Sequence, residues 1–388
     1  MFRIAPVIKA DLVQTAFYPI QSISWKKNPE MNLFSTRDPE YHRIEKRKVG
    51  HAYSLPSLLQ SEAAIDSCTS LFMQRLDEFA SKNQPVDLGT WLQYYAFDVV
   101  GEVTFASKLG FLEQGSDVDG MMKAIEGMLT YASLCGQVPE MHYFLLGNPL
   151  LTKLMPAMET WNQTLVFTLK AINGRASIER DGELISADSE GRDQLSRWAY
   201  VKSSSPDKMS TRDIVVHLST NVFAGSDTTS IALRAMIYFL CRNPRCMQRL
   251  VGDIDAADQA GKLSHPISYK EATDIPYLNA VLKESMRMHP SVGLLMERHV
   301  PPQGVEIDGH FLRGGTIVGI NPWVTNHNTD FFPNPNEFRP ERWLEASEQQ
   351  LKGMDSLWEL NFGGGARKCI GRNISCKSMT LPEIVSYS

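Results

Sequence analysis

The sequence predicts a mainly α-helical fold with a small β-sheet subdomain, formed by a single domain over residues 1–388. Three patterns predict this class. A capping-box sequence at Ser210 opens a long apolar segment, a second apolar stripe follows Pro276, and short strands joined by an Asp-Gly turn lie at 305–311. No linker or repeat period divides the chain, although its length would allow two or three domains.

The composition narrows the class of protein and of partner. A hydrophobic content of 43% suffices for a large core, and a net charge of −5 gives no reason to expect nucleic acid as a partner. Six cysteines do not make a disulfide framework in a chain this long, so we expect a reducing compartment. The first 25 residues include Arg3, Lys9 and Asp11, and therefore resemble neither a membrane span nor a signal peptide. The polar stretch 177–208 reads as a surface connection.

The longest apolar segment predicts a single long helix. Ser210 is its expected N-cap and Asp213 its third helical residue, and apolar residues then recur at helical spacing until Asn243-Pro244. A helix of this span would be about 50 Å long at 1.5 Å per residue, enough to cross the molecule.

The centre of this segment is poor helix material. Residues 225–229 read Gly-Ser-Asp-Thr-Thr, which should cost roughly 2 to 3 kcal/mol relative to alanine. Two interpretations remain open on these residues alone. Either Ser226 or Asp227 caps a second helix over 231–240, or the broken local rule marks a functional site within one helix.

Another helix is expected after Asp274-Ile275-Pro276. Four apolar residues form its buried stripe: Leu278, Val281, Leu282 and Met286. Glu284 and Arg287 lie three residues apart on a different face, a pair worth only about 0.2 to 0.5 kcal/mol on any surface helix. The short strands follow, and then a Pro-Glu-Arg segment that contains Arg342.

The most informative segment is the glycine-rich loop at 361–371, which sets Cys369 shortly before an expected helix. Glycines let backbone amides approach the sulfur, and a helix N-terminus favours a thiolate, so the loop suits a metal-bound cysteine. Arg367 can clamp a carboxylate such as a haem propionate. A lone cysteine is more often a buried apolar residue, whereas the glycine spacing fits neither common phosphate-binding pattern.

The pattern Phe-x-x-Gly-x-Arg-x-Cys-x-Gly is filled at every fixed position from Phe362 to Gly371, and with it the chain resembles a cytochrome P450. The resemblance implies the P450 fold and a haem b cofactor, with Cys369 as the axial thiolate and only protein ligand to the iron. It also implies that Phe362, Gly363, Arg367 and Gly371 contact the haem.

The same resemblance gives roles to the centre of the long helix, which is similar to the oxygen-binding kink of the family. Ala224 and Gly225 would leave room for a ligand at the iron. Thr228 would place a hydroxyl beside the oxygen, and Asp227 would relay protons from solvent.

The resemblance also gives roles to charged residues elsewhere in the chain. Glu284, Arg287 and Arg342 would form a buried ion triad that supports the haem site without acting in catalysis. Arg298 matches a position that contacts a haem propionate, and a solvated surface arginine is its alternative.

A family motif near the N-terminus aligns with 41–47, where His42 and Lys46 replace a tryptophan and an arginine that contact the propionates. This segment is equally consistent with a solvated basic helix face that docks an acidic electron-transfer partner.

The segments 91–98 and 319–323 are similar to filamentous-fungal members, including the pisatin demethylase-like group. The resemblance implies a monooxygenase that inserts one atom of dioxygen into a small apolar substrate of secondary metabolism, with NADPH-cytochrome reductase as electron donor. It implies the cytosolic face of the endoplasmic reticulum membrane as location, or the cytoplasm if this shortened chain is the true product.

Two departures from the family favour other functions. The chain ends at Ser388, seventeen residues after Gly371, and residues 6–39 look too short for the usual sheet strands and pocket-lining loop; the family's hydrophobic anchor is not seen. One alternative is a non-catalytic truncated member. Another is a haem-thiolate isomerase or dehydratase without a reductase, although such enzymes have little use for Asp227 and Thr228.

Overall fold

The computed structural model describes residues 12–25, 28–148, 163–180 and 193–379. The main helices are α2 (Pro39–Val49), α3 (Leu55–Leu59), α4 (Glu62–Ser81), α5 (Leu88–Phe105), α6 (Phe111–Gln114), α7 (Met121–Cys135), α9 (Gln163–Arg180), α10 (Gln194–Ser204), α11 (Thr211–Arg242), α12 (Pro244–Gln259), α13 (Tyr269–Thr273), α14 (Pro276–Met288), α15 (Pro322–Asn326), α16 (Arg342–Glu345), α17 (Glu348–Trp358) and α18 (Arg372–Met379). The strands are β1 (Val13–Gln14), β2 (Ile23–Trp25), β3 (Asn28–Glu30), β4 (Met296–His299), β5 (Val305–Ile307), β6 (His310–Leu312) and β7 (Ile317–Ile320). The predicted class, mainly α with a small β-sheet subdomain, is confirmed.

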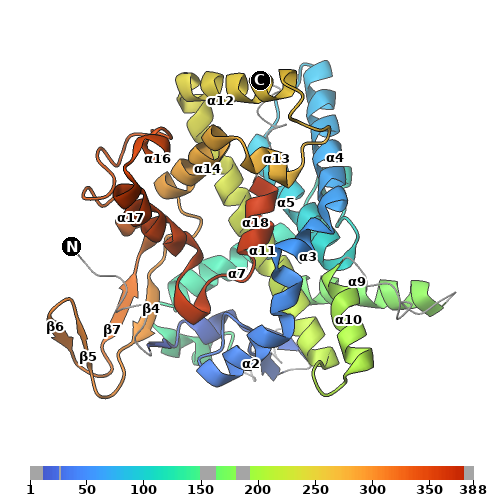
Figure 1. Ribbon diagram of the computed structural model, residues 1–388. Coiled ribbons are helices and arrows are strands. Elements are labelled where there is room, and N and C mark those ends of the chain that lie inside the picture. Colours follow the sequence, from blue (N-terminus) through green and yellow to red (C-terminus); the bar gives the residue numbers. More distant parts are fainter. Residues whose placement is uncertain (1–11, 26–27, 149–162, 181–192, 380–388) are drawn as a thin grey trace.

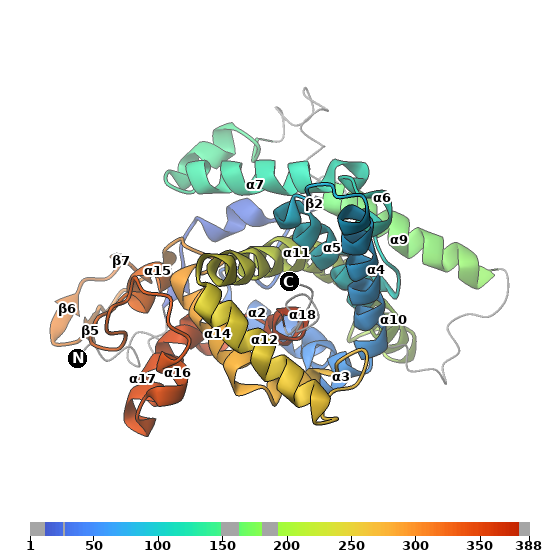
Figure 2. The same cartoon turned by 90° about the horizontal axis from the view of Figure 1, so that it is seen from above.

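Helix α11 runs through the middle of the molecule, and α5, α14 and α18 pack against it (Figures 1 and 2). The predicted capping box is present, since Ser210 and Asp213 each bond the backbone of the other. Pro244 begins α12, so the predicted end of the long helix is also confirmed.

The centre of α11 remains one helix, so the interpretation as two helices is wrong. The polar side chains do not act as caps, because they bond back to carbonyls of the preceding turn. Ser226 Oγ donates to Val222 at 3.0 Å, and Thr228 Oγ1 donates to Ala224 at 2.8 Å. Gly225 is explained by packing, because a β-carbon there would lie 2.9 Å from Cγ2 of Val100 on α5.

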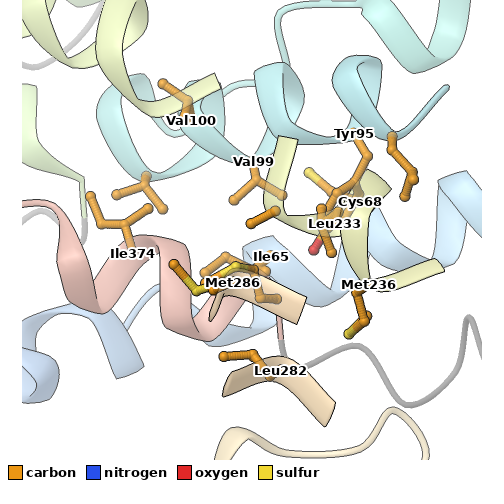
Figure 3. Packing of buried hydrophobic residues seen from close by; sticks show 14 of the residues in the cluster. Ile65, Cys68, Tyr95, Val99, Val100, Leu233, Met236, Leu282, Met286 and Ile374 are labelled. Atoms are coloured by element: carbon orange, nitrogen blue, oxygen red, sulfur yellow. The ribbon is translucent and has the colours of Figure 1, made fainter. Parts of the chain in front are cut away.

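The core lies where α4, α5, α11, α14 and α18 converge (Figure 3). Ile65, Val99, Leu233 and Ile374 represent four of these helices, and each is at most 6% exposed. The stripe predicted for α14 belongs to the same core, because its four apolar residues are all buried. This packing compensates the weak helix propensity at the centre of α11.

The strands form small antiparallel sheets. Strands β4 to β7 lie on the side of the molecule that carries α17 (Figure 1), whereas β2 contacts α11. In one sheet β4 pairs with both β1 and β7, which places Arg298 in its middle strand. The predicted hairpin is β5–β6, and its turn has positive φ at both Asp308 (52°) and Gly309 (78°), as a type I′ turn requires.

Two expectations about chain segments are wrong. The stretch 177–208 is more than a surface connection, because α10 lies within it and buries Trp198 against Tyr53 and His217. The segment 6–39 does hold sheet strands, since β1, β2 and β3 lie there. Periodicity missed them because these strands are only two or three residues long. In the described part of the chain, no helix combines the length and apolarity that a membrane crossing requires.

Candidate functional site

The cysteine loop, residues 361–371, holds Cys369 by its backbone and leaves the residue exposed to solvent. The Cys369 amide donates to the Phe362 carbonyl at 2.7 Å, and α18 begins three residues later. Burial by surrounding protein atoms raises the pKa of the thiol, and hydrogen bonds from the amides of Gly371 and Arg372 act in the opposite direction. The loop therefore aims two backbone donors at a sulfur that a ligand can still reach.

Three further residues of the cysteine loop, Phe362, Gly363 and Gly371, have environments that suit their residue types. Phe362 is buried and packs its ring edge-on against Trp358, with the centroids 5.6 Å apart. Gly363 has φ of 76°, a conformation that favours glycine. A β-carbon at Gly371 would lie 3.9 Å from the Cys369 sulfur, so a side chain could be placed there only in contact with it.

The polar centre of α11 lies next to the helix that follows the cysteine. Thr229 Oγ1 is 3.0 Å from Ser375 Oγ of α18, although the two residues are far apart in sequence. Ala224 is exposed and Thr228 half-buried on a helix whose neighbouring residues are mostly buried. Fold and motif together thus place the two most informative segments of the sequence side by side.

Asp227 belongs to a partly buried chain of hydrogen bonds between α11 and α5. Gln93 Nε2 donates to Asp227 Oδ1 at 3.1 Å, and Gln93 Oε1 accepts from Arg234 at 2.6 Å. Arg234 also donates to the Gly89 carbonyl at 2.7 Å. Burial raises the pKa of Asp227, Arg234 opposes this, and Glu126 adds to it. Sequence reasoning missed Gln93 and Arg234, because nothing in the local sequence indicates that Gln93 bonds both Asp227 and Arg234.

Four basic residues from three segments form what we call the cationic cluster: His42 and Lys46 of α2, Arg298 of β4, and Arg367 of the cysteine loop. Their charges act on one another. Burial, followed by Arg367 and Lys46, lowers the pKa of His42 to about 4. Burial, followed by Arg298, lowers the pKa of Arg367 to about 10. Mutual repulsion of this kind identifies a site with an excess of positive charge.

Contacts with neutral groups hold the cationic cluster in place. Arg367 donates to the carbonyls of Leu33 and Thr36 at 3.3 and 3.0 Å. Arg298 donates to the Tyr18 hydroxyl and lies over the Tyr18 ring, 5.0 Å from its centroid. No carboxylate in the described part of the chain forms an ion pair with any of the four. An anionic group beside the cysteine loop, such as the two propionates of haem, fits this donor set.

The sequence left 41–47 as either a propionate site or a solvated basic face, and α2 has basic residues on a buried side and on an exposed side. His42 is buried and Lys46 half-buried on the side that faces the cysteine loop. Arg43 and Arg47 are exposed.

The predicted triad meets in the interior. The Glu284 carboxylate accepts from Arg287 at 2.8 and 2.9 Å and from Arg342 at 3.0 Å, and Glu284 and Arg287 have no exposed surface. The Trp343 indole and the Arg339 amide also donate to it, at 2.9 and 3.0 Å. The acid is therefore fully hydrogen-bonded, as a buried carboxylate must be.

A buried asparagine connects this triad to the cysteine loop. Arg287 donates to the Asn326 carbonyl at 3.0 Å, and Asn326 Nδ2 donates to Asn361 Oδ1, also at 3.0 Å. Asn361 is the first residue of the cysteine loop. The link gives the triad a physical route by which to position the loop, and sequence reasoning did not find it.

The segment between α14 and β4 supplies apolar surface near the site. Ser291 at its start donates to the Thr228 carbonyl at 2.8 Å, and Met296 at its end lies near Gly363, 3.9 Å from a β-carbon built there. Three exposed apolar residues lie between these anchors: Val292, Leu294 and Leu295. Sequence reasoning missed them, since exposed apolar residues in a loop carry no pattern.

Comparison with known proteins agrees with the geometry. A sequence profile of the family described as Cytochrome P450 matches residues 8–382. A cytochrome P450 monooxygenase from Aspergillus flavus is 35% identical over 98% of this chain and 75% of its own length. One from Alternaria alternata is 37% identical over 88% of this chain and 90% of its own length. Pisatin demethylase from Fusarium vanettenii is 36% identical over 91% of this chain and 67% of its own length.

The profile covers nearly the whole chain. The cysteine loop, the Glu284 triad and the cationic cluster of this chain occupy one region of the structure. The chain therefore belongs to the cytochrome P450 family of oxidoreductases, which bind haem through a cysteine thiolate.

Proposed function

We propose that this protein is a haem-dependent monooxygenase that inserts one atom of dioxygen into a small apolar organic substrate. The observation that carries the proposal is the contact between Thr229 and Ser375, which sets the Asp227–Thr228 pair beside the helix that follows Cys369. A proton source next to a thiolate-ligated haem suits reductive activation of dioxygen. NADPH-cytochrome reductase is the proposed electron donor, and the cytosolic face of the endoplasmic reticulum the proposed location.

Cys369 would ligate the haem iron, and His42, Arg298 and Arg367 would hold the propionates. When bound, the haem supplies the redox chemistry that activates dioxygen. The protein contributes the thiolate, its two amide donors and the surrounding positive charge.

Asp227 and Thr228 would control the delivery of protons that the activation of dioxygen requires. The raised pKa of Asp227 lets this carboxyl hold a proton nearer to neutral pH, and Gln93 fixes the orientation of its Oδ1. Thr228 Oγ1 donates its hydrogen to the Ala224 carbonyl, so its lone pairs remain free to accept a hydrogen bond. A haem-thiolate isomerase or dehydratase would not need this delivery.

Val292, Leu294 and Leu295 would contact the substrate. The segment that carries them is bonded to Thr228 through Ser291 at one end and lies near Gly363 of the cysteine loop at the other. Apolar side chains of this kind favour an apolar molecule. A secondary metabolite or its precursor is the proposed class, and pisatin, which names one relative, is a suitable first compound to test.

Replacement of Thr228 by alanine tests the oxygen chemistry. We expect the variant to keep its haem and thiolate spectrum while the ratio of product formed to NADPH consumed falls and hydrogen peroxide rises. Thr220→Ala is the matched control, because Thr220 makes the same backbone bond on α11 two turns earlier, at 2.8 Å to Val216. An unchanged ratio in Thr228→Ala would remove the hydroxyl from the proton path and favour the isomerase alternative.

Replacement of Cys369 by serine tests the ligand separately. The thiolate-type Soret band of the reduced carbon monoxide complex should disappear, whereas Cys376→Ser on α18 should retain it. Retention of the band in Cys369→Ser would show that another residue ligates the iron.

A further inference from the structure

Lys46 contacts the cysteine loop directly, where its family counterpart is expected to contact a propionate. Its Nζ donates to the carbonyl of Ala366 at 2.6 Å and to that of Lys368 at 3.3 Å. Two backbone oxygens of the loop therefore converge on one ammonium group. A lysine ammonium has three donors, so these two bonds use most of its capacity.

The second of these bonds acts on the peptide unit that carries the cysteine. The carbonyl of Lys368 accepts from Lys46, and the amide of Cys369, in the same planar unit, donates to the Phe362 carbonyl at 2.7 Å. A planar peptide unit bonded at both ends cannot rotate without losing one bond. The backbone of Cys369 is therefore held from within the loop and from α2.

The other three members of the cationic cluster are bonded differently. Arg367 and Arg298 donate to the carbonyls of residues 33, 36 and 297 and to the Tyr18 hydroxyl. Within the described residues, no hydrogen bond joins His42 to the loop backbone. In the described part of the chain, Lys46 is the one member of the cluster that donates to carbonyls of the loop, on either side of Arg367 and directly before the cysteine.

We infer that Lys46 is a positioning residue for the cysteine ligand: it clamps the loop so that the Cys369 sulfur keeps one place before and after haem binds. The remaining basic residues of the cluster are left to bind the propionates. The inference needs no turnover and so stands apart from the proposed oxygen insertion.

Hydrogen exchange of the loop amides tests the clamp in protein with and without haem. We expect amides within 362–371 to exchange about tenfold faster in Lys46→Met than in wild type, in both states, because charged hydrogen bonds that restrain the loop are lost. The reduced carbon monoxide complex of this variant should also lose its thiolate-type Soret band faster. Arg47→Met removes the same charge from the next, exposed residue of α2 and should change neither rate.

Lys46→Arg separates the clamp from propionate binding and serves if Lys46→Met does not fold. A longer, planar guanidinium cannot set one nitrogen where the two carbonyls converge, so loop exchange should still rise several-fold. If Lys46 instead binds a propionate, arginine should serve at least as well. The inference would be overturned if haem-free Lys46→Met and Lys46→Arg both exchanged their loop amides at the wild-type rate and only the rate of haem loss changed.

Discussion

The Glu284 triad and the cationic cluster both place arginines around the cysteine loop, yet they differ in how their charges are satisfied. In the triad, a carboxylate lies between two arginines, and the remaining guanidinium donors end on backbone carbonyls. In the cationic cluster, the described contacts are with neutral oxygens, and burial and then neighbouring cations lower the pKa values of His42 and Arg367.

The difference indicates separate physical roles. A fully bonded ion network in the interior adds little by forming but costs much to break, so it enforces one arrangement of the chain. A group of cations without an acid is unfavourable until an anion arrives, so its free energy is available for binding. We therefore propose that the triad fixes the arrangement of the site and that the cationic cluster selects the anionic group that the site binds.

Replacement of Glu284 by alanine should have the largest effect on this comparison. Two buried arginines would lose their counter-charge, and we expect the free energy of unfolding to fall by about 3 to 5 kcal/mol, with loss of haem-loaded protein. Denaturant titration of the haem-free protein measures the first quantity. Glu337→Ala is the control, because Glu337 is exposed and serves the two arginines only through its carbonyl. A stable, haem-replete Glu284→Ala variant with slowed turnover would show that the triad is not a folding element.

Replacement of Arg298 by methionine should have an intermediate effect, and on a different quantity. Haem should leave the protein about tenfold faster because one charge-assisted bond to a propionate is lost, while the free energy of unfolding without haem changes by less than about 1 kcal/mol. Transfer of haem to an excess of apomyoglobin gives the rate. Arg313→Met, an exposed charge in the same β region, should leave that rate unchanged. Equal rates of haem loss in Arg298→Met and Arg313→Met would show that Arg298 of the cationic cluster does not bind a propionate.

The smallest effect is expected from pH acting on His42. Its pKa in the folded protein is about 4 against an ordinary 6.5, so the folded state binds fewer protons than the unfolded state between these values. The contribution is fully present above pH 6.5 and is lost as pH falls toward 4, by about 1 to 3 kcal/mol in haem-free protein.

His42→Gln should flatten the pH dependence of stability within this window. Addition of haem to the wild type should also flatten it, because a nearby propionate would stabilise the imidazolium. A slope that haem leaves unchanged would place the propionates away from His42.

Local sequence was sufficient for elements whose signals lie within a few residues. The capping box at Ser210 predicted where α11 begins, and Asp308-Gly309 predicted the hairpin turn. The break expected in α11 was a wrong alternative, because propensity alone cannot account for the packing of Gly225 against Val100. Helix α10 was missed for a related reason, since only two of its apolar residues, Leu195 and Trp198, are buried.

The sequence by itself determined the cysteine loop, the Glu284 pair and the polar centre of the long helix, because each is a short pattern of residue types. Only the tertiary structure decided which distant groups complete them: Gln93 for Asp227, Asn326 between the triad and the loop, and Lys46 for the backbone beside Cys369. Such partners cannot be read from spacing along one chain. A hydrogen bond depends on distance and direction in space, and these pairs meet only after the helices have packed.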